Sequence, residues 1–278
     1  MNLLKPHSIE EYIVWMLRTG EKKTTQLLNE VQLAKKKLTK QGFYLALRKL
    51  KEEEIVVVYK KRVSLSSAWI LRMQDWMDTV GRQYTVGAKS FSIISLADKE
   101  SISYTFSNSR NLDTFWGHAQ NLILHHTLPS DPIFSYDSHY WIYLARESLE
   151  KKLLQEMVKL KRQFLMTVGG STPLDKLIRA DFKSDYLQYN IDKVFDRSDY
   201  YSTIIGDFII EVTLDPILVN RIEELYASHT SVTKDLSQEL AVLLDKKGEN
   251  KLKISHNKKR AQILRKKFEK NFYVLQAL

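Results

Sequence analysis

The sequence predicts a mixed α/β protein in three parts, which are residues 1–84, residues 90–229 and residues 230–278. Residues 39–65 combine a helix-like apolar period with a β-branched run, which is typical of a helix followed by a hairpin. Strand-like and helix-like patterns then alternate through residues 90–229, as in an α/β domain. The last part has a helical period and a net charge of +7, which predicts a basic helical tail.

The helix and hairpin in residues 39–65 are predicted from local signals. Thr39 can cap the helix, because its hydroxyl can accept a hydrogen bond from a first-turn N–H group. One face of the helix carries apolar side chains at i, i+4 and i+7: Phe43, Leu47 and Leu50. Residues 55–59 are a β-branched run and residues 63–65 a short return strand, so we expect a hairpin.

Long polar side chains make this stretch a candidate DNA-binding surface. The face opposite the apolar stripe carries Lys40, Gln41, Tyr44, Arg48 and Lys51. The turn between the two strands adds Lys60, Lys61 and Arg62. Arginine can read guanine with two hydrogen bonds and glutamine can read adenine, while lysines at a turn reach phosphates.

Two further helices are predicted upstream. Ser8 and Glu11 form a capping-box pattern, and the helix that follows ends at Gly20. Thr24 or Thr25 can cap a second helix. In this element order, and in the pattern FYLALRKLKEEEIVVVYKKRVSL, the chain up to about residue 67 resembles the winged helix-turn-helix domains of bacterial and archaeal transcription regulators. The resemblance implies that the helix after Thr39 is the recognition helix and that the hairpin is the wing.

The charge distribution favours nucleic acid as the partner. The chain has 278 residues and a net charge of +10. Residues 1–65 and 230–278 each carry a net +7, whereas residues 66–145 and 146–229 each carry −2. Contact of both ends with a polyanion would produce this pattern, and a uniform solubility charge would not. Winged helices also serve as protein–protein modules and as parts of replication machines, so the fold alone leaves those roles open.

The composition of the chain excludes several other classes of protein and of site. The chain has no cysteine, which excludes disulfides, thiol catalysis and cysteine-bound zinc. The sequence shows no signal-peptide pattern and no apolar run of membrane-spanning length. We therefore expect a cytoplasmic protein without a membrane segment, and we predict no cofactor.

The middle part predicts interleaved strands and helices. The predicted strands are residues 91–96, 102–106, 133–136, 163–168, 186–191, 200–205 and 208–213, the first two joined as a hairpin. The predicted helices are residues 111–126, 146–161, 216–229 and one that opens at Pro173. Gly206 and Asp207 predict a tight turn between the last two strands.

The stretches KRQFLMTVGG and YYSTIIGDFIIEVTLDP resemble the phospholipase-D-like effector domains that follow the winged helix in TrmB-type regulators. Phospholipase D activity needs two His-x-Lys motifs, each with a downstream Asp. The chain has one His-x-Lys, at His256 and Lys258, without an Asp at the required distance. The resemblance therefore implies a domain without that activity, and we expect no enzyme.

Two further groups of residues are candidate sites. His118, His125, His126 and His139, with Asp131 and Asp137, match no metal-ligand spacing, so we expect no metal site. Gly169, Gly170, Ser171 and Thr172 follow a strand and open a helix. Free N–H groups there would favour an anion or effector, and an ordinary tight turn is the alternative.

The chain also carries two apolar stripes and a basic C-terminal segment. Apolar stripes at residues 69–80 and 232–243 predict a homodimer held by at least one of them. Ser255 is expected to cap a basic last helix over residues 257–272. This helix could contact DNA, act as an oligomerisation arm, lie on an anionic membrane or fold back on its own domain, and DNA is favoured because phosphate contacts release counterions.

The function predicted from these signals is a transcriptional regulator that binds double-stranded DNA as a homodimer, with a non-catalytic α/β effector or assembly domain. The alternative is a winged-helix protein of a plasmid or phage replication system, or of a toxin–antitoxin or defence system. The sequence does not name a small-molecule effector.

Overall fold

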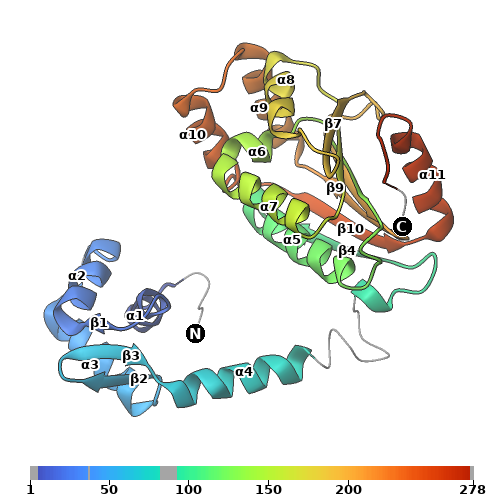
Figure 1. The fold of residues 1–278 in the computed structure, drawn as a ribbon. Helices are drawn as coiled ribbons and strands as arrows, with labels where there is room; N and C mark the ends of the chain where they lie inside the picture. Colours follow the sequence, from blue (N-terminus) through green and yellow to red (C-terminus); the bar gives the residue numbers. More distant parts are fainter. Residues whose placement is uncertain (1–5, 37, 82–92, 276–278) are drawn as a thin grey trace. The chain divides into compact units, whose positions relative to one another are not determined.

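The computed structural model describes residues 6–36, 38–81 and 93–275. The chain divides into two compact units, unit 1 (Met1–Tyr84) and unit 2 (Thr85–Leu278). Both contain helices and a sheet, which confirms the mixed α/β class (Figure 1). No helix in the described ranges is both long and apolar enough to cross a membrane.

Unit 1 has the element order predicted from the sequence, with one short extra strand. Its helices are α1 (Ile9–Leu17), α2 (Thr24–Ala34), α3 (Lys40–Glu52) and α4 (Ser67–Gly81). Its strands are β1 (Lys22–Lys23), β2 (Val56–Tyr59) and β3 (Arg62–Leu65). The strands form an antiparallel sheet in the order β1-β3-β2.

Local caps explain where the helices of unit 1 begin. The Glu11 N–H donates to Ser8 Oγ at 3.1 Å and the Ser8 N–H donates to Glu11 Oε2 at 3.2 Å, which completes the capping box of α1. The Gly42 N–H donates to Thr39 Oγ1 at 3.0 Å, as expected for α3. The cap predicted for α2 is wrong, because Thr24 is already helical and its hydroxyl donates to the Lys61 carbonyl at 3.0 Å.

The core of unit 1 lies between the helices and the sheet. The apolar stripe of α3 is buried there, with Phe43 and Leu50 fully covered. The helices α1 and α2 and the strand β3 also supply fully buried side chains: Ile13, Leu27, Val31 and Val63. Burial of such side chains stabilises a fold by about 1.5–3 kcal/mol each, so the stripe fixes which face of α3 points outward.

Unit 2 is built on a seven-stranded sheet in the order β4-β10-β9-β8-β5-β6-β7. The strands are β4 (Ser101–Phe106), β5 (Ile133–Asp137), β6 (Phe164–Val168), β7 (Leu187–Ile191), β8 (Tyr200–Ile205), β9 (Phe208–Thr213) and β10 (Asn250–His256). The helices are α5 (Ser109–Leu124), α6 (Trp141–Ala145), α7 (Glu147–Lys159), α8 (Pro173–Ile178), α9 (Pro216–Ser228), α10 (Lys234–Leu243) and α11 (Lys258–Glu269). β5, β6 and β7 run parallel, and the other pairs are antiparallel.

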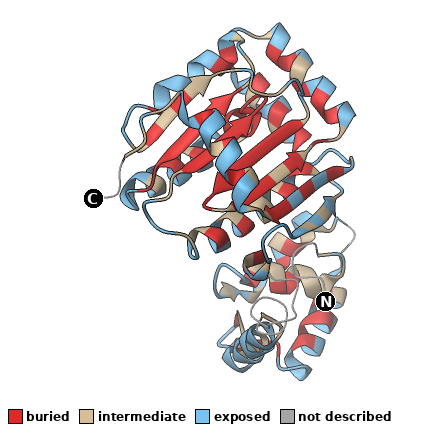
Figure 2. Ribbon diagram, turned by 90° about the vertical axis from the view of Figure 1, so that its right-hand side faces the viewer, coloured by how far each residue is buried: buried red, intermediate tan, exposed pale blue. Residues whose placement is uncertain are grey.

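Helices cover both faces of this sheet unequally (Figures 1 and 2). The larger core lies under α5 to α10 and includes the fully buried Trp141. The smaller core lies on the opposite face, where Ala261, Leu264 and Phe268 of α11 pack on side chains of β5, β6, β8 and β9. Both faces of the central strands are therefore shielded from solvent, and all six residues of β8 are buried.

The predicted first hairpin of unit 2 is wrong. Residues 91 and 92 lie outside the described residues, and Ile93–Ser95 form a 3-10 helix, η2, instead of a strand. β4 pairs with β10, where Ser101 lies opposite Ser255. The alternating pattern of residues 91–96 fits a strand, but the pairing partner of β4 comes from the far end of the sequence, which no local pattern can show.

The separate helical tail is also wrong. α10 packs on α6 in the larger core, where Leu236 and Leu240 are fully buried. β10 lies between β4 and β9, and Ser255 belongs to this strand, so that Asn257 caps α11. β10 alternates buried and exposed residues, but lysines fill its exposed positions, and that basic character hid the strand period.

Candidate nucleic-acid interface

The outer face of α3 carries the polar residues predicted to meet DNA. Lys40, Gln41, Tyr44, Arg48 and Lys51 are all exposed, opposite the buried stripe. Four of them, Lys40, Gln41, Tyr44 and Arg48, line a shallow surface hollow together with Leu45. Leu45 was not predicted, and its exposed fraction of 67% is high for a leucine. An apolar side chain at this position can contact a thymine methyl group.

Arg48 is held only loosely. Its Nε lies 3.4 Å from Oε1 of Glu52, one turn further along α3. The side chains of the pair are 76% and 69% exposed, so the contact contributes at most about 1 kcal/mol and leaves the guanidinium free to exchange partners. Lys49, the next residue, lies instead near α1, with its Nζ 3.8 Å from Glu10 Oε1.

The hairpin turn has a defined geometry. Tyr59 pairs with Arg62, which leaves Lys60 and Lys61 as the two turn residues. Their φ angles are +46° and +63°, the left-handed region that a type I′ turn requires at both positions. Two lysines adopt this conformation at a cost that Asn and Gly would avoid. Both side chains are exposed, which places two positive charges at the tip.

Arg62 occupies a different position from the one predicted. It is the first residue of β3 instead of part of the turn, and its Nη2 lies 2.8 Å from Glu21 Oε1. The side chain is 46% exposed, so this ion pair is open to solvent and Arg62 stays at the edge of the surface.

A second hollow joins the hairpin to α3. Its lining comes from the start of α2, from α3 and from the hairpin: Lys23, Thr24, Thr25, Tyr44, Leu47, Val58, Lys60, Lys61 and Arg62. Tyr44 belongs to both hollows, so the outer face of α3 and the hairpin form one continuous surface. The backbone N–H of Thr24 donates to the Lys61 carbonyl at 2.9 Å and ties the turn to α2. Lys23, Thr24 and Thr25 were not predicted as part of this surface, although the basic pair before α2 is visible in the sequence.

The anion site predicted at residues 169–172 is not supported by the hydrogen bonds. The N–H groups of Gly169 and Gly170 donate to the carbonyls of Asp137 and Ser138, at 2.8 and 2.7 Å. The Thr172 N–H donates to Asp175 Oδ2 at 3.0 Å, so a carboxylate already lies at the start of α8. A Cβ on Gly170 would overlap the His139 ring and the Asp175 carboxylate, so close packing explains this glycine.

The histidines do not gather into a metal site. His118, His125 and His126 are exposed, whereas His139 is buried. His139 Nδ1 lies 3.0 Å from Asp175 Oδ1, and Nε2 lies 3.3 Å from Glu223 Oε2. Burial alone would lower the pKa of His139, but the hydrogen bonds with Asp175 and Glu223 outweigh it and raise the pKa to about 9. Among the described residues, no three His, Asp or Glu side chains are grouped to hold a metal ion.

Three of the six basic side chains of α11 make hydrogen bonds within unit 2. Arg260 Nη1 donates to Glu211 Oε2 at 2.6 Å, and Arg265 Nη1 donates to the Gly206 carbonyl at 2.8 Å. Lys267 Nζ donates to the Val194 carbonyl at 3.0 Å. α11 is therefore packed on its own domain, as in the fold-back alternative, and contact of its remaining exposed lysines with DNA stays a prediction.

No protein-family model matches the chain, and no curated protein matches it. A solved structure that is similar belongs to TrmBL2, an archaeal chromatin protein whose structure is described as showing a novel mode of DNA binding. The sequences are 11% identical, the TM-score is 0.34, and the match covers 95% of this chain and 92% of that one. A likeness this weak carries no argument about function.

Proposed function

We propose that unit 1 is a winged helix that binds double-stranded DNA and that the protein is a DNA-binding regulator of transcription. The observation that carries the proposal is the continuous exposed surface over α3 and the β2–β3 hairpin. α3 has the length and the exposed polar face to lie in a major groove, and the two turn lysines project from the hairpin as a wing. Unit 2 then serves as an effector or assembly domain.

The residue types on this surface differ in the contacts that they can make with DNA. Arg48 and Gln41 on α3 have the donors and acceptors that read base edges. Lys60 and Lys61 offer positive charge on flexible stems, which suits phosphates. Lys40 and Lys51 stand at the two ends of α3, where the rims of a groove present phosphates. This arrangement predicts sequence preference from α3 and salt-dependent affinity from the rest.

Arg48→Ala tests the reading role of α3. The preferred sequence is first found by sequencing duplexes that the full chain binds from a random pool. We expect Arg48→Ala to weaken binding to that sequence by about 1–3 kcal/mol and to relax the preference at one position. Lys49→Ala is the matched control, because it removes the same charge from the adjacent residue, which lies beside Glu10. If Arg48→Ala selects the same sequence with the same affinity, α3 is not the reader.

We also propose a homodimer that forms through α4. No residue of this 15-residue helix is buried, although all of its residues are described. Leu71, Trp76 and Met77 are 64%, 57% and 57% exposed, which is unusual for large apolar side chains close together on one helix. A two-fold pair would cover them and present two copies of α3 to a palindromic site. The other predicted stripe, in α10, belongs to the core of unit 2, where Leu236, Leu240 and Leu243 are buried.

Sedimentation equilibrium tests the dimer. We expect a dimer mass at tens of micromolar for the parent and a monomer mass for the double variant Trp76→Glu, Met77→Glu. Gln74→Glu is the control, since it adds charge to the same helix without removing apolar surface. A parent protein that sediments as a monomer would reject the dimer.

A further inference from the structure

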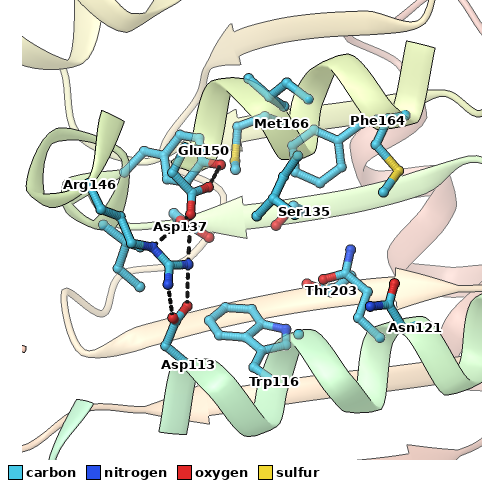
Figure 3. Close-up of a pocket in the computed structure, with 17 residues that line it drawn as sticks. Asp113, Trp116, Asn121, Ser135, Asp137, Arg146, Glu150, Phe164, Met166 and Thr203 are labelled. Carbon is cyan, nitrogen blue, oxygen red and sulfur yellow. Dashed lines mark hydrogen bonds and ion pairs between the residues drawn. The ribbon is translucent and has the colours of Figure 1, made fainter. Parts of the chain in front are cut away.

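A cavity of about 150 Å³ lies in unit 2 between α5, α7 and the sheet (Figure 3). β5 contributes Ser135 and Asp137 to its wall, and β6 contributes Phe164 and Met166. An engineered apolar cavity of the same volume takes up benzene in another protein, so a molecule of that size is accommodated.

Three carboxyl groups but one guanidinium line this cavity. Arg146 bridges two of the carboxylates, because its Nη2 lies 2.9 Å from Asp113 Oδ1 and 2.7 Å from Glu150 Oε1. Glu150 also accepts a hydrogen bond from the Tyr140 hydroxyl at 2.7 Å. The dashed lines in Figure 3 show these contacts. Asp113 and Glu150 thus share the guanidinium of Arg146. In the part of the chain that the structure describes, no second cationic side chain lines the cavity that could pair with Asp137.

Asp137 is the carboxyl group without a partner. Only 4% of the residue is exposed, and its Oδ1 is buried without a hydrogen-bond partner among the described residues. Burial raises its pKa well above the ordinary value, and the nearby charges of Glu150 and Asp113 raise it further. An unpaired buried carboxyl group is costly, so a structure keeps one where a proton or a cation satisfies it.

The rest of the wall is mostly apolar. Its apolar side chains come from α5, α6, α7 and the strands: Trp116, Ile142, Leu153, Leu154, Met157, Phe164 and Met166. Trp116 also holds a buried Nε1 without a hydrogen-bond partner among the described residues. An aromatic face favours a cation electrostatically, in addition to the carboxyl group. The cavity therefore combines one unsatisfied acid with room for an apolar body.

We propose that this cavity binds a small organic cation, in which an ammonium group meets Asp137 and an apolar body of about the size of benzene fills the remainder. A neutral apolar molecule would leave Asp137 unsatisfied, and an anion would be repelled by the excess of carboxyl groups. The proposal rests on unit 2 alone and is independent of DNA binding by unit 1.

Isothermal titration calorimetry on the full chain tests the proposal with three probes of one shape: benzylamine, benzyl alcohol and benzoate. We expect benzylamine to bind at least about tenfold more tightly than benzyl alcohol, as a charge-assisted hydrogen bond provides, and benzoate not to bind. n-Butylamine is a second amine, for the case that the ring is too wide. If neither amine binds, or if benzylamine and benzyl alcohol bind equally, the proposal is overturned.

Two variants connect the binding to the cavity. Asp137→Asn keeps the shape and removes the charge, so we expect the preference for amine over alcohol to fall to within about twofold. Asp196→Asn is the matched control, because that side chain is 95% exposed on the surface of the same unit. Amine binding that is unchanged by Asp137→Asn would overturn the assignment.

Gly117→Leu keeps the test decisive if Asp137→Asn fails to fold. Gly117 lines the cavity from within α5, and a Cβ built there meets nothing within 4 Å. Leucine stabilises a helix by about 1 kcal/mol relative to glycine, so this variant should fold at least as well as the parent. We expect it to weaken amine binding by partly filling the site, and unchanged affinity would place the amine elsewhere.

Discussion

Phe268→Ala is expected to destabilise unit 2 strongly, because this side chain anchors α11 on the sheet. Phe268 is fully buried, and its ring centroid lies 6.1 Å from that of Tyr136 and 6.2 Å from that of Phe195. Truncation removes the apolar transfer free energy of the ring and leaves a cavity among side chains that are fixed by the strands. For a fully buried phenylalanine these two terms together amount to about 3–5 kcal/mol.

Urea denaturation measures this loss in the full chain. Trp15, Trp69 and Trp76 are replaced by Phe in every variant, so that Trp116 and Trp141 report on unit 2 alone. We expect the free energy of unfolding to fall by about 3–5 kcal/mol for Phe268→Ala. A large part of the total stability of a domain is then lost, since that total is about 5–15 kcal/mol.

Ile263→Ala is the matched control on the same helix. Ile263 is 58% exposed, so its truncation should change the free energy of unfolding by no more than about 0.5 kcal/mol. Equal effects of the two variants would refute the reasoning, because α11 would then not be packed on the sheet.

Two further predictions concern the hairpin turn and His139. The double variant Lys60→Asn, Lys61→Gly removes two charges and supplies the residues that a type I′ turn prefers. The melting temperature of unit 1 should therefore be no lower than in the parent. The slope of log affinity for DNA against log salt should become shallower by about 0.9 for each lysine that contacts a phosphate. A parental slope would show that the tip stays off DNA. The raised pKa of His139, about 9 against 6.5, means that its charged form stabilises unit 2 fully below pH 6.5 and that this contribution is lost as the pH rises through 9. Urea denaturation should show that the free energy of unfolding falls by up to about 3 kcal/mol between pH 6 and 9.5. The fall is smaller to the extent that solvent screens the partly exposed Glu223. His139→Gln should remove this pH dependence.

Local signals in the sequence predicted most of unit 1 correctly. The spacing of Phe43, Leu47 and Leu50 identified the buried face of α3, and thereby its exposed face, because a helix has a fixed period. The left-handed turn at Lys60 and Lys61 could not be predicted, since neither residue type favours that conformation. The tie between Thr24 and the turn depends on tertiary structure alone.

Pairings between distant residues explain what was missed in unit 2. β10 was hidden by the lysines on its exposed positions, and its neighbours in the sheet are far away in sequence. α6 is short and apolar on all sides, so it lacks the one-sided period of a surface helix. The cavity around Asp137 collects residues from α5, α7 and three strands, and no spacing along the chain relates Asp113 to Asp137 and Glu150.

The central position of β10 has a consequence for the order of folding. β10 pairs with β4 and β9 on its two sides, and Ser255 meets Ser101 across more than half of the chain. Contacts this distant in sequence must close a long loop before they stabilise anything, and such closure slows folding. During synthesis, the edges of β4 and β9 that pair with β10 therefore stay unpaired until residue 256 has been made. Unit 1 can fold earlier, because its contacts join residues that are close in sequence. Unit 2 is thus the part of the chain most exposed to aggregation during that interval.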